Sequence, residues 1–257
     1  MKFKVDINCD LGESYGAFKV GNDEKIMPHI TSANIACGFH AGDPVTIAHT
    51  INLAKEYNVA IGAHPSYPDL LGFGRREMRL TPEEIRNYTI YQVSALQGFA
   101  STIGANLQHV KLHGALYNTA SEDKKTSNAV IEAVQALNPN LIIFAPPKSA
   151  LAEAARNTGL KVAHEFFADR AYNADGSLVS RKKPNAIIQE RQKVVERAIK
   201  AVKEQKVIAI NGDAIKIGTI HTICVHGDTP TAVELAKALK EELAKANIEV
   251  KPVGSFL

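Results

Sequence analysis

The amino-acid sequence predicts an α/β fold, in which residues 1–257 form a single-domain (β/α) barrel of seven strands, similar to a TIM barrel. Short apolar runs alternate with amphipathic segments along the chain, as expected of parallel strands joined by helices. The 257 residues match the roughly 250 of a one-domain α/β barrel, and no linker or repeat divides them. An open doubly wound sheet is the alternative, because one sequence does not give the order of the strands.

The predicted barrel strands are seven short runs rich in β-branched and other apolar residues. They are residues 3–8, 32–37, 59–63, 109–113, 141–145, 161–165 and 222–226. Helices between them imply right-handed crossovers and a parallel sheet with both faces covered.

Four helices have recognisable starts. Asp43 before Pro44 predicts a helix to about Tyr57, and Thr81 with Glu84 forms a capping box for a helix to about Thr102. Ser121 is the predicted cap of a helix to Leu137, and Thr229-Pro230 opens a last helix to about Ala246. One segment departs from this alternation: residues 206–217 are predicted to form a β-hairpin with a type I′ turn at Asn211-Gly212.

Composition excludes several classes of protein. A net charge of +3 and interspersed Lys and Glu give no nucleic-acid footprint. No apolar run approaches the roughly 20 residues that span a bilayer, so no membrane contact is expected. Three cysteines without CxxC spacing favour a reducing compartment, and we expect a cytoplasmic protein.

Polar side chains gather where the predicted strands end. In a barrel of parallel strands these carboxyl ends share one face, which is where active sites form. Asp6, Asn8 and Asp10 share one face of the first strand, and Glu13 follows as a further carboxylate. A carboxylate in an apolar site can act as acid or base. The alternative is that Asp10 caps a turn.

His40 and His64 end the next two strands and, with Asp10, could complete a His/His/carboxylate metal site. Two other roles remain open for these histidines. They could move protons or hold a polar substrate, or they could be turn residues that donate to carbonyl groups.

Lys111 and His113 share one face of the fourth strand, and Tyr117 follows them. Inside a barrel, Lys111 would need an anionic partner, because a buried lysine is costly unless it is paired. The alternative places Lys111 on the outer face of the strand, under a helix.

The remaining candidate residues follow the third, sixth and seventh predicted strands. Glu165, Asp169 and Arg170 come after the sixth strand, where Arg170 could hold a carboxylate or phosphate unless it only pairs with Asp169. His226 faces the predicted mouth, and Asp228 binds substrate or caps the last helix. Residues 68–76 form a glycine-containing loop, which we interpret as a lid that brings Arg75 over an anionic group. Cys9 and Cys37 are more simply buried side chains than nucleophiles.

Six motifs together resemble the LamB/YcsF lactam-utilisation family over nearly the whole chain. They are DINCDLGE (6–13), ANIACGFHAGD (33–43), GAHPSYPD (62–69), KLHGALYN (111–118), FADRAY (167–172) and CVHGD (224–228). Leu112 stands where the family pattern has proline, on the strand face opposite the polar pair.

The resemblance implies a fold like that of polysaccharide deacetylases and a role as the A-type subunit of an ATP-dependent 5-oxoprolinase. Such an enzyme opens 5-oxoproline to L-glutamate with hydrolysis of ATP to ADP and phosphate. The resemblance also implies two other subunits, of B and C type, and ATP as a cofactor. Those partners could bind the ATP, because no GxxxxGK[ST] loop occurs in this chain.

The resemblance also implies roles for the site residues. Asp10 or Glu13 with a histidine would be the general base, Lys111 and Arg170 would stabilise phosphate and carboxylate, and His113 or His226 would protonate the leaving nitrogen. A stand-alone metal-dependent amidase or deacetylase, and a noncatalytic subunit that binds a small acid, are the alternatives.

Overall fold

Seven parallel strands close into a barrel in the computed structural model, which describes residues 3–181, 183–227 and 231–257. The barrel strands, in spatial order, are β1 (Phe3–Leu11), β2 (Ser32–Ala36), β3 (Ala60–His64), β4 (Leu107–Val110), β5 (Ile142–Ala145), β6 (Val162–Phe167) and β9 (Thr222–Val225). The barrel closes because β9 pairs in parallel with both β6 and β1. The predicted fold class is therefore confirmed, and the open sheet is excluded.

The first strand has three neighbours. Its second half pairs with β2 and β9, whereas its first residues, Phe3 to Val5, pair with β10 (Ile248–Val250) outside the closed barrel. β10 was not among the strands predicted from the sequence. Through β10, the segment that follows α8 pairs with the first residues of β1.

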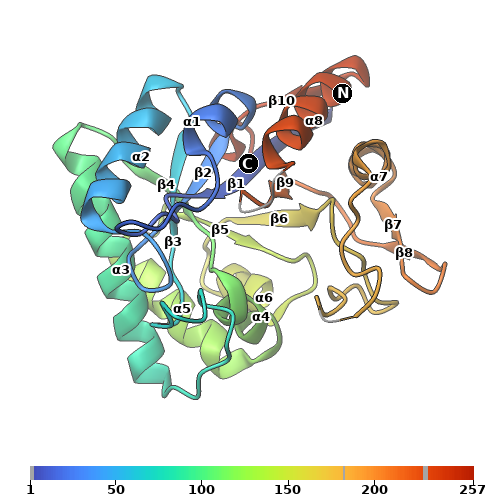
Figure 1. Cartoon of the computed structure of the whole chain (residues 1–257). Coiled ribbons are helices and arrows are strands. Elements are labelled where there is room, and N and C mark those ends of the chain that lie inside the picture. Colours follow the sequence, from blue (N-terminus) through green and yellow to red (C-terminus); the bar gives the residue numbers. More distant parts are fainter. Residues whose placement is uncertain (1–2, 182, 228–230) are drawn as a thin grey trace.

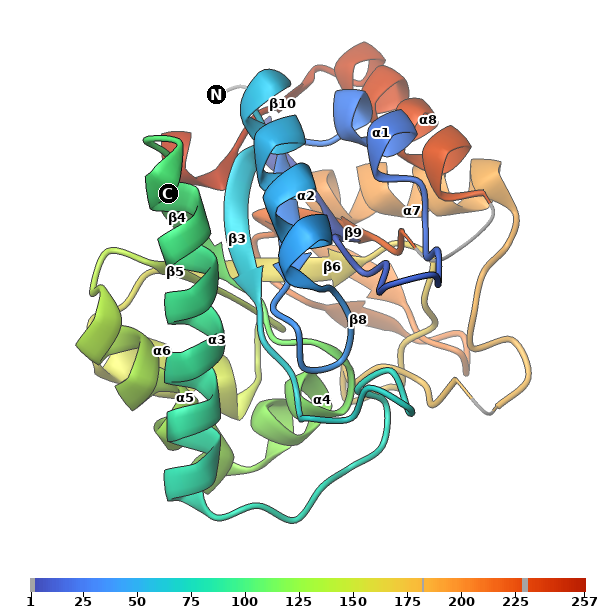
Figure 2. The same ribbon diagram turned by 60° about the vertical axis from the view of Figure 1, so that its left-hand side comes forward.

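Helices cover the outside of the barrel (Figure 1). They are α1 (Asp23–Ile26), α2 (Pro44–Glu56), α3 (Pro82–Thr102), α4 (Gly114–Glu122), α5 (Lys124–Leu137), α6 (Ala150–Asn157), α7 (Arg191–Glu204) and α8 (Ala232–Lys245), with short 3₁₀ turns at Met27–His29 and Val253–Ser255. Figure 2 shows the long helix α3 running beside α2 and the strands β3 and β4. The predicted caps Asp43 and Thr81 are confirmed, including the capping box with Glu84.

Two local predictions are wrong. Ser121 lies inside α4, where its hydroxyl donates to the carbonyl of Tyr117, and Asp123 caps the next helix instead. The predicted hairpin exists as β7 (Lys206–Ile208) and β8 (Ala214–Lys216), but Asn211 lacks the positive φ that a type I′ turn requires. A longer loop with Gly212 at φ 92° connects the strands. The predicted opening of the last helix at Thr229-Pro230 lies outside the described residues.

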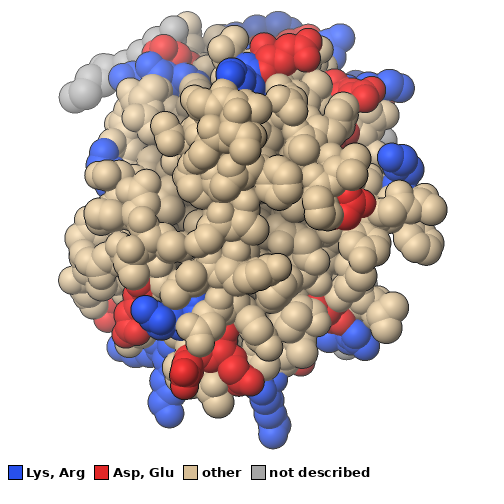
Figure 3. Space-filling model, turned by 90° about the vertical axis from the view of Figure 1, so that its left-hand side faces the viewer, with Lys and Arg blue, Asp and Glu red and all other residues tan. Residues whose placement is uncertain are grey.

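Charged side chains are unevenly distributed over the surface. Figure 3 shows the side on which α2 and α3 lie, where Lys, Arg, Asp and Glu gather toward the top and bottom and leave the middle nearly free of charge. Val45 and Tyr91, from α2 and α3, are among the exposed large apolar side chains. No described helix is both long enough and apolar enough to cross a membrane.

Candidate active site

The carboxyl ends of the barrel strands surround a cavity of about 1190 Å³. Ten of the fourteen predicted site residues line it: Asp10, Glu13, His64, Arg75, Lys111, His113, Tyr117, Glu165, Arg170 and His226. Three more, Asn8, His40 and Asp169, are buried in contact with that group. Asp228 lies outside the described residues. The strand ends therefore bring together residues that are up to 218 positions apart in the sequence (Asn8 to His226).

Lys111 is the centre of the site. Its Nζ lies 2.6 Å from Asp10 Oδ1, 3.2 Å from Glu165 Oε1 and 3.2 Å from Asn8 Oδ1, so the side chain points into the barrel as predicted. Burial disfavours the charged ammonium, but the Asp10 carboxylate and then Cys224 and Glu165 outweigh burial and raise the pKa of Lys111 well above its ordinary value. The ammonium is thus fixed as a cation between two carboxylates.

Glu165 and Tyr117 complete this ion network. The Tyr117 hydroxyl donates to Glu165 Oε2 at 2.7 Å, and Asn8 Nδ2 donates to Glu165 Oε1 at 3.0 Å. Burial, followed by the adjacent carboxylate of Glu165, raises the pKa of Tyr117 well above its ordinary value. Tyr117 is therefore a neutral donor near neutral pH.

Two residues that the sequence analysis did not select, Asn34 and His109, orient the network from below. Asn34 Nδ2 donates to Asn8 Oδ1 at 2.7 Å and to Asp10 Oδ1 at 2.8 Å, while Asn34 Oδ1 lies 2.8 Å from His109 Nε2. Since a carbonyl oxygen only accepts, His109 carries its proton on Nε2. His109 falls on the same β4 face as Lys111 and His113, and this alternation is the signal that could have selected it.

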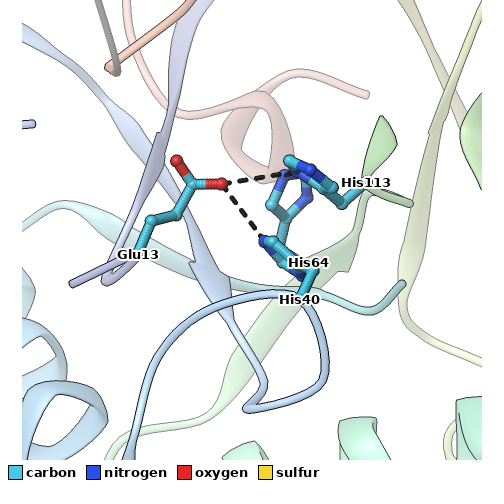
Figure 4. A group of neighbouring side chains, drawn as sticks. All are labelled: Glu13, His40, His64 and His113. Atoms are coloured by element: carbon cyan, nitrogen blue, oxygen red, sulfur yellow. Dashed lines mark hydrogen bonds and ion pairs between the residues drawn. The ribbon is translucent and has the colours of Figure 1, made fainter. Parts of the chain in front are cut away.

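A group of three histidines and one carboxylate lies beside Lys111. One ligand atom from each of Glu13, His40, His64 and His113 lies within 4.8 Å of the others (Figure 4). Glu13 Oε1 is 3.1 Å from His40 Nε2 and 3.3 Å from His113 Nδ1. This buried group could hold a divalent metal ion. It differs from the predicted set, because Glu13 stands in the place given to Asp10, and His113 joins it.

The hydrogen bonds of two of these histidines fix their tautomers. His64 Nδ1 donates to the Lys111 carbonyl at 2.7 Å, and His113 Nε2 donates to the Phe73 carbonyl at 2.9 Å. In the neutral rings, His64 Nε2 and His113 Nδ1 are then both unprotonated, yet they face each other at 2.9 Å. Two lone pairs at this distance repel each other, so the geometry calls for a cation between them, either a shared proton or a metal ion.

Burial favours the neutral form of two rings of this group, His40 and His113. Burial first, and then the neighbouring histidines, lower the pKa of His40 and of His113 well below the ordinary value. The Nδ1 atom of His40 is buried without a hydrogen-bond partner among the described residues. Neutral imidazoles with outer nitrogens bound to carbonyls are the state in which histidine binds metal.

The loop between β3 and α3 packs against the histidines. Phe73, at φ 53°, presents its carbonyl to His113, and Gly74 leaves no room for a side chain because a Cβ would lie 2.8 Å from both His113 and His40. Arg75 lines the cavity, as the lid hypothesis requires, whereas Arg76 pairs with Asp69. Movement of this loop stays a prediction.

Asp169 and Arg170, which follow the end of β6, bind different partners and do not pair with each other. Asp169 Oδ2 lies 2.8 Å from His226 Nδ1, so its partner is this histidine and not Arg170, whose Nη2 donates to the Val179 carbonyl at 2.6 Å. Burial would raise the pKa of Asp169, but His226 lowers it below its ordinary value. Asp169 thus forms a carboxylate–imidazole pair at the cavity wall.

The three cysteines are free and buried, as the simpler interpretation expects. Burial, as the first cause, raises the pKa of Cys9 and Cys224 well above the ordinary value, and that of Cys37 to about 12. Thiols of this kind are poor nucleophiles near neutral pH.

Asp6 closes the floor of the barrel, and we expect it to make stability depend on pH. Its carboxylate accepts hydrogen bonds from Thr222, Thr31 and Ser32, yet burial outweighs them and raises its pKa to about 6. A carboxyl whose pKa is raised on folding favours the folded state at low pH and loses that contribution as pH rises through 6. Between pH 5 and 7, wild type should lose about 1 kcal/mol of unfolding free energy relative to Asp6→Asn, measured by urea denaturation. Equal pH profiles for the two proteins would contradict this.

The fold and site define a parallel β/α barrel with a buried polar site at the carboxyl ends of its strands. The model of the LamB/YcsF family matches residues 5–257, and this chain belongs to that family. Relatives match it over their full length. The A subunit of the 5-oxoprolinase of Pyrococcus abyssi is 52% identical over 254 residues, and that of Campylobacter jejuni is 51% identical over 255, with at least 99% of each chain covered.

A solved structure gives the same result for the fold. The lactam utilization protein of Thermus thermophilus superposes with a TM-score of 0.92 at 45% identity, covering 97% of this chain and 99% of the other. The resemblance found in the six motifs is therefore confirmed.

Proposed function

We propose that this chain is the lactam-opening subunit of an ATP-dependent 5-oxoprolinase, which converts 5-oxoproline to L-glutamate with hydrolysis of ATP to ADP and phosphate. The observation that carries the proposal is the convergence of Asp10, Glu13, His64, His113 and His226 on one cavity. Relatives that bear the name of the 5-oxoprolinase A subunit, matched over 99% of this chain, support it. The word "subunit" in those names supports partner chains, which we place in the B and C types.

Amide resonance explains why such a reaction needs ATP. A five-membered lactam resists attack by water, and phosphorylation of its oxygen would remove that resistance. We assign phosphorylation to the partner subunits, since this chain lacks a GxxxxGK[ST] loop. This chain then adds water to the activated ring carbon, and the ring C–N bond breaks to give the free amine and an acyl phosphate. A second water cleaves the acyl phosphate to glutamate and phosphate.

The contacts support particular roles. Glu13, which touches His40 and His113, is placed to take the proton of water, and Asp10 orients the site through Lys111 and His64. His226, held by Asp169, would protonate the leaving nitrogen. Lys111 holds the carboxylates of Asp10 and Glu165 in fixed positions, so the site needs little reorganisation during the reaction.

The test is glutamate release from 5-oxoproline by this chain, with and without candidate partner subunits and with and without ATP. We expect glutamate when partners and ATP are both present. Glu13→Gln should then lower the rate at least about 100-fold, the usual size of general-base catalysis. The matched control is Glu234→Gln, on the exposed face of α8. No glutamate from folded, assembled partners would overturn the proposal.

The facing lone pairs of His64 and His113 favour a second candidate, a stand-alone metal-dependent amidase. Glu13, His64 and His113, with His40, would hold a divalent ion, which supplies an activated water when bound. We expect the purified chain to bind about one equivalent of Zn²⁺, by elemental analysis after gel filtration, and His64→Gln to bind much less.

The control for this prediction is His49→Gln, because His49 lies exposed on α2 and outside the group. Amide hydrolysis without ATP, lost on treatment with a chelator, would favour this candidate over the first. No bound metal in the wild-type chain would overturn it and leave a shared proton between His64 and His113.

A further inference from the structure

The cavity extends well beyond the ion network around Lys111. Its volume of about 1190 Å³ exceeds the roughly 300 to 1,000 Å³ of ordinary ligand pockets, and a five-membered lactam would fill a small part of it. The segment after β6, residues 174–181, forms one wall, and Lys216 of β8 joins it. Arg181 and Lys216 from these elements line the cavity, as does Asp175, whose carboxylate accepts hydrogen bonds from Ser177.

Lys111 is not available to bind an anion, although the sequence analysis gave it that role. An ammonium has three hydrogens to donate. Asp10, Glu165 and Asn8 all lie within 3.2 Å of Nζ and satisfy them. An anionic group of the substrate must therefore be bound by other cations of the cavity.

Arg170 has the properties of such a cation. Its side chain is 7% exposed and lines the cavity, one nitrogen donates to the Val179 carbonyl, and its buried Nε has no hydrogen-bond partner among the described residues. A buried donor without a partner costs free energy that a ligand would recover. The neighbouring carboxylate of Asp169 is already bound to His226.

Arg181 lies on the same cavity wall. Both guanidinium groups line the cavity, and burial first, with the charge of Arg181 second, lowers the pKa of Arg170. No described carboxylate forms an ion pair with either group. Two like charges facing one cavity are stabilised when an anion binds between them, and guanidinium groups bind the oxygens of phosphate with two parallel hydrogen bonds.

We propose that Arg170 and Arg181 form a subsite for a phosphate dianion, beside the residues that open the lactam. Under the proposed function, on which this assignment of the ligand rests, the subsite holds the phosphoryl group of the activated substrate and then the phosphate product. The phosphoryl group of the substrate and the free phosphate product both present tetrahedral, negatively charged oxygens to the subsite. The subsite itself belongs to this chain and requires neither ATP nor partner subunits.

The test is calorimetric titration of inorganic phosphate into the isolated chain at constant ionic strength. We expect saturable binding by the wild type, and Arg181→Gln should weaken it about tenfold, because one charge-assisted contact is lost. Arg181 is exposed, so this variant should fold normally. Arg170→Lys keeps the charge but removes Nε, and it should also weaken binding.

Two controls make the result specific. Arg191→Gln removes the same charge from the start of α7, which does not line the cavity, and should leave phosphate affinity unchanged. Acetate titrated in place of phosphate should bind more weakly, which distinguishes a phosphate subsite from a carboxylate subsite. Absence of saturable phosphate binding, or equal affinity in Arg181→Gln, would overturn the proposal.

This readout is independent of turnover. Phosphate binding that depends on Arg181, in a chain that forms no glutamate with its partners, would leave the subsite standing and refute the proposed reaction. If the chain and its partners form glutamate but the chain does not bind phosphate, the proposed reaction would stand and the phosphate subsite would be refuted.

Discussion

Lys111→Met is expected to abolish glutamate formation and to lower the free energy of unfolding by about 3 to 5 kcal/mol, the cost of removing one partner from a buried ion pair. The substitution keeps the length of the side chain but leaves Asp10 and Glu165 without their cation. Urea denaturation and the partner-dependent glutamate assay measure the two effects. The matched control is Lys237→Met, on the exposed face of α8, which should change neither.

The pH dependence of this loss has a definite sign. Burial would raise the pKa of Asp10, but His64 and then Lys111 hold it well below its ordinary value. That contribution to stability is present above pH 4 and disappears as pH falls through the lowered value. Without Lys111 the buried carboxylate of Asp10 should take up a proton more readily, so the variant should lose more stability at pH 8 than at pH 5. Equal losses at both pH values would contradict the ion network.

The barrel was predictable because its signals are local. Each strand is a short apolar run with a polar end. The side chains of Asp43 and Thr81 cap their helices by accepting from backbone N–H groups two or three residues further on. The predicted cap Ser121 was wrong because Asp123, two residues later, is also a common capping residue. Only the packed structure shows which of the two precedes the first turn of the helix. The strand β10 was missed since it pairs with β1 across almost the whole sequence.

The site was predictable as a set but not as a geometry. Strand ends gather on one face, so thirteen of the fourteen chosen residues could be found at or beside the cavity. Which atoms meet depends on loop geometry that the sequence does not show. The turn after β1 brings Glu13, rather than Asp10, against His40 and His113. Arg181 was missed because it lies in an irregular segment with no strand end to mark it.

A second substitution with a large expected effect on stability is at Gly62, a glycine of β3 beneath the site. Gly62→Ala should lower the free energy of unfolding by about 3 kcal/mol, because a Cβ on β3 would overlap the imidazole ring of His109. The ring cannot move aside easily, since it stacks on Phe144 with centroids 4.1 Å apart. Displacing it would also remove the donor that orients Asn34, so glutamate formation should fall as well.

Gly98→Ala is the matched control for this substitution. Gly98 lies in α3, and a Cβ added there would meet no atom within 4 Å, so alanine should stabilise the protein by about 0.5 to 1 kcal/mol. If the loss in Gly62→Ala comes from the clash, it should shrink greatly when His109→Ala is already present. A loss of the same size in both backgrounds would mean that the cost of Gly62→Ala does not come from a clash with His109.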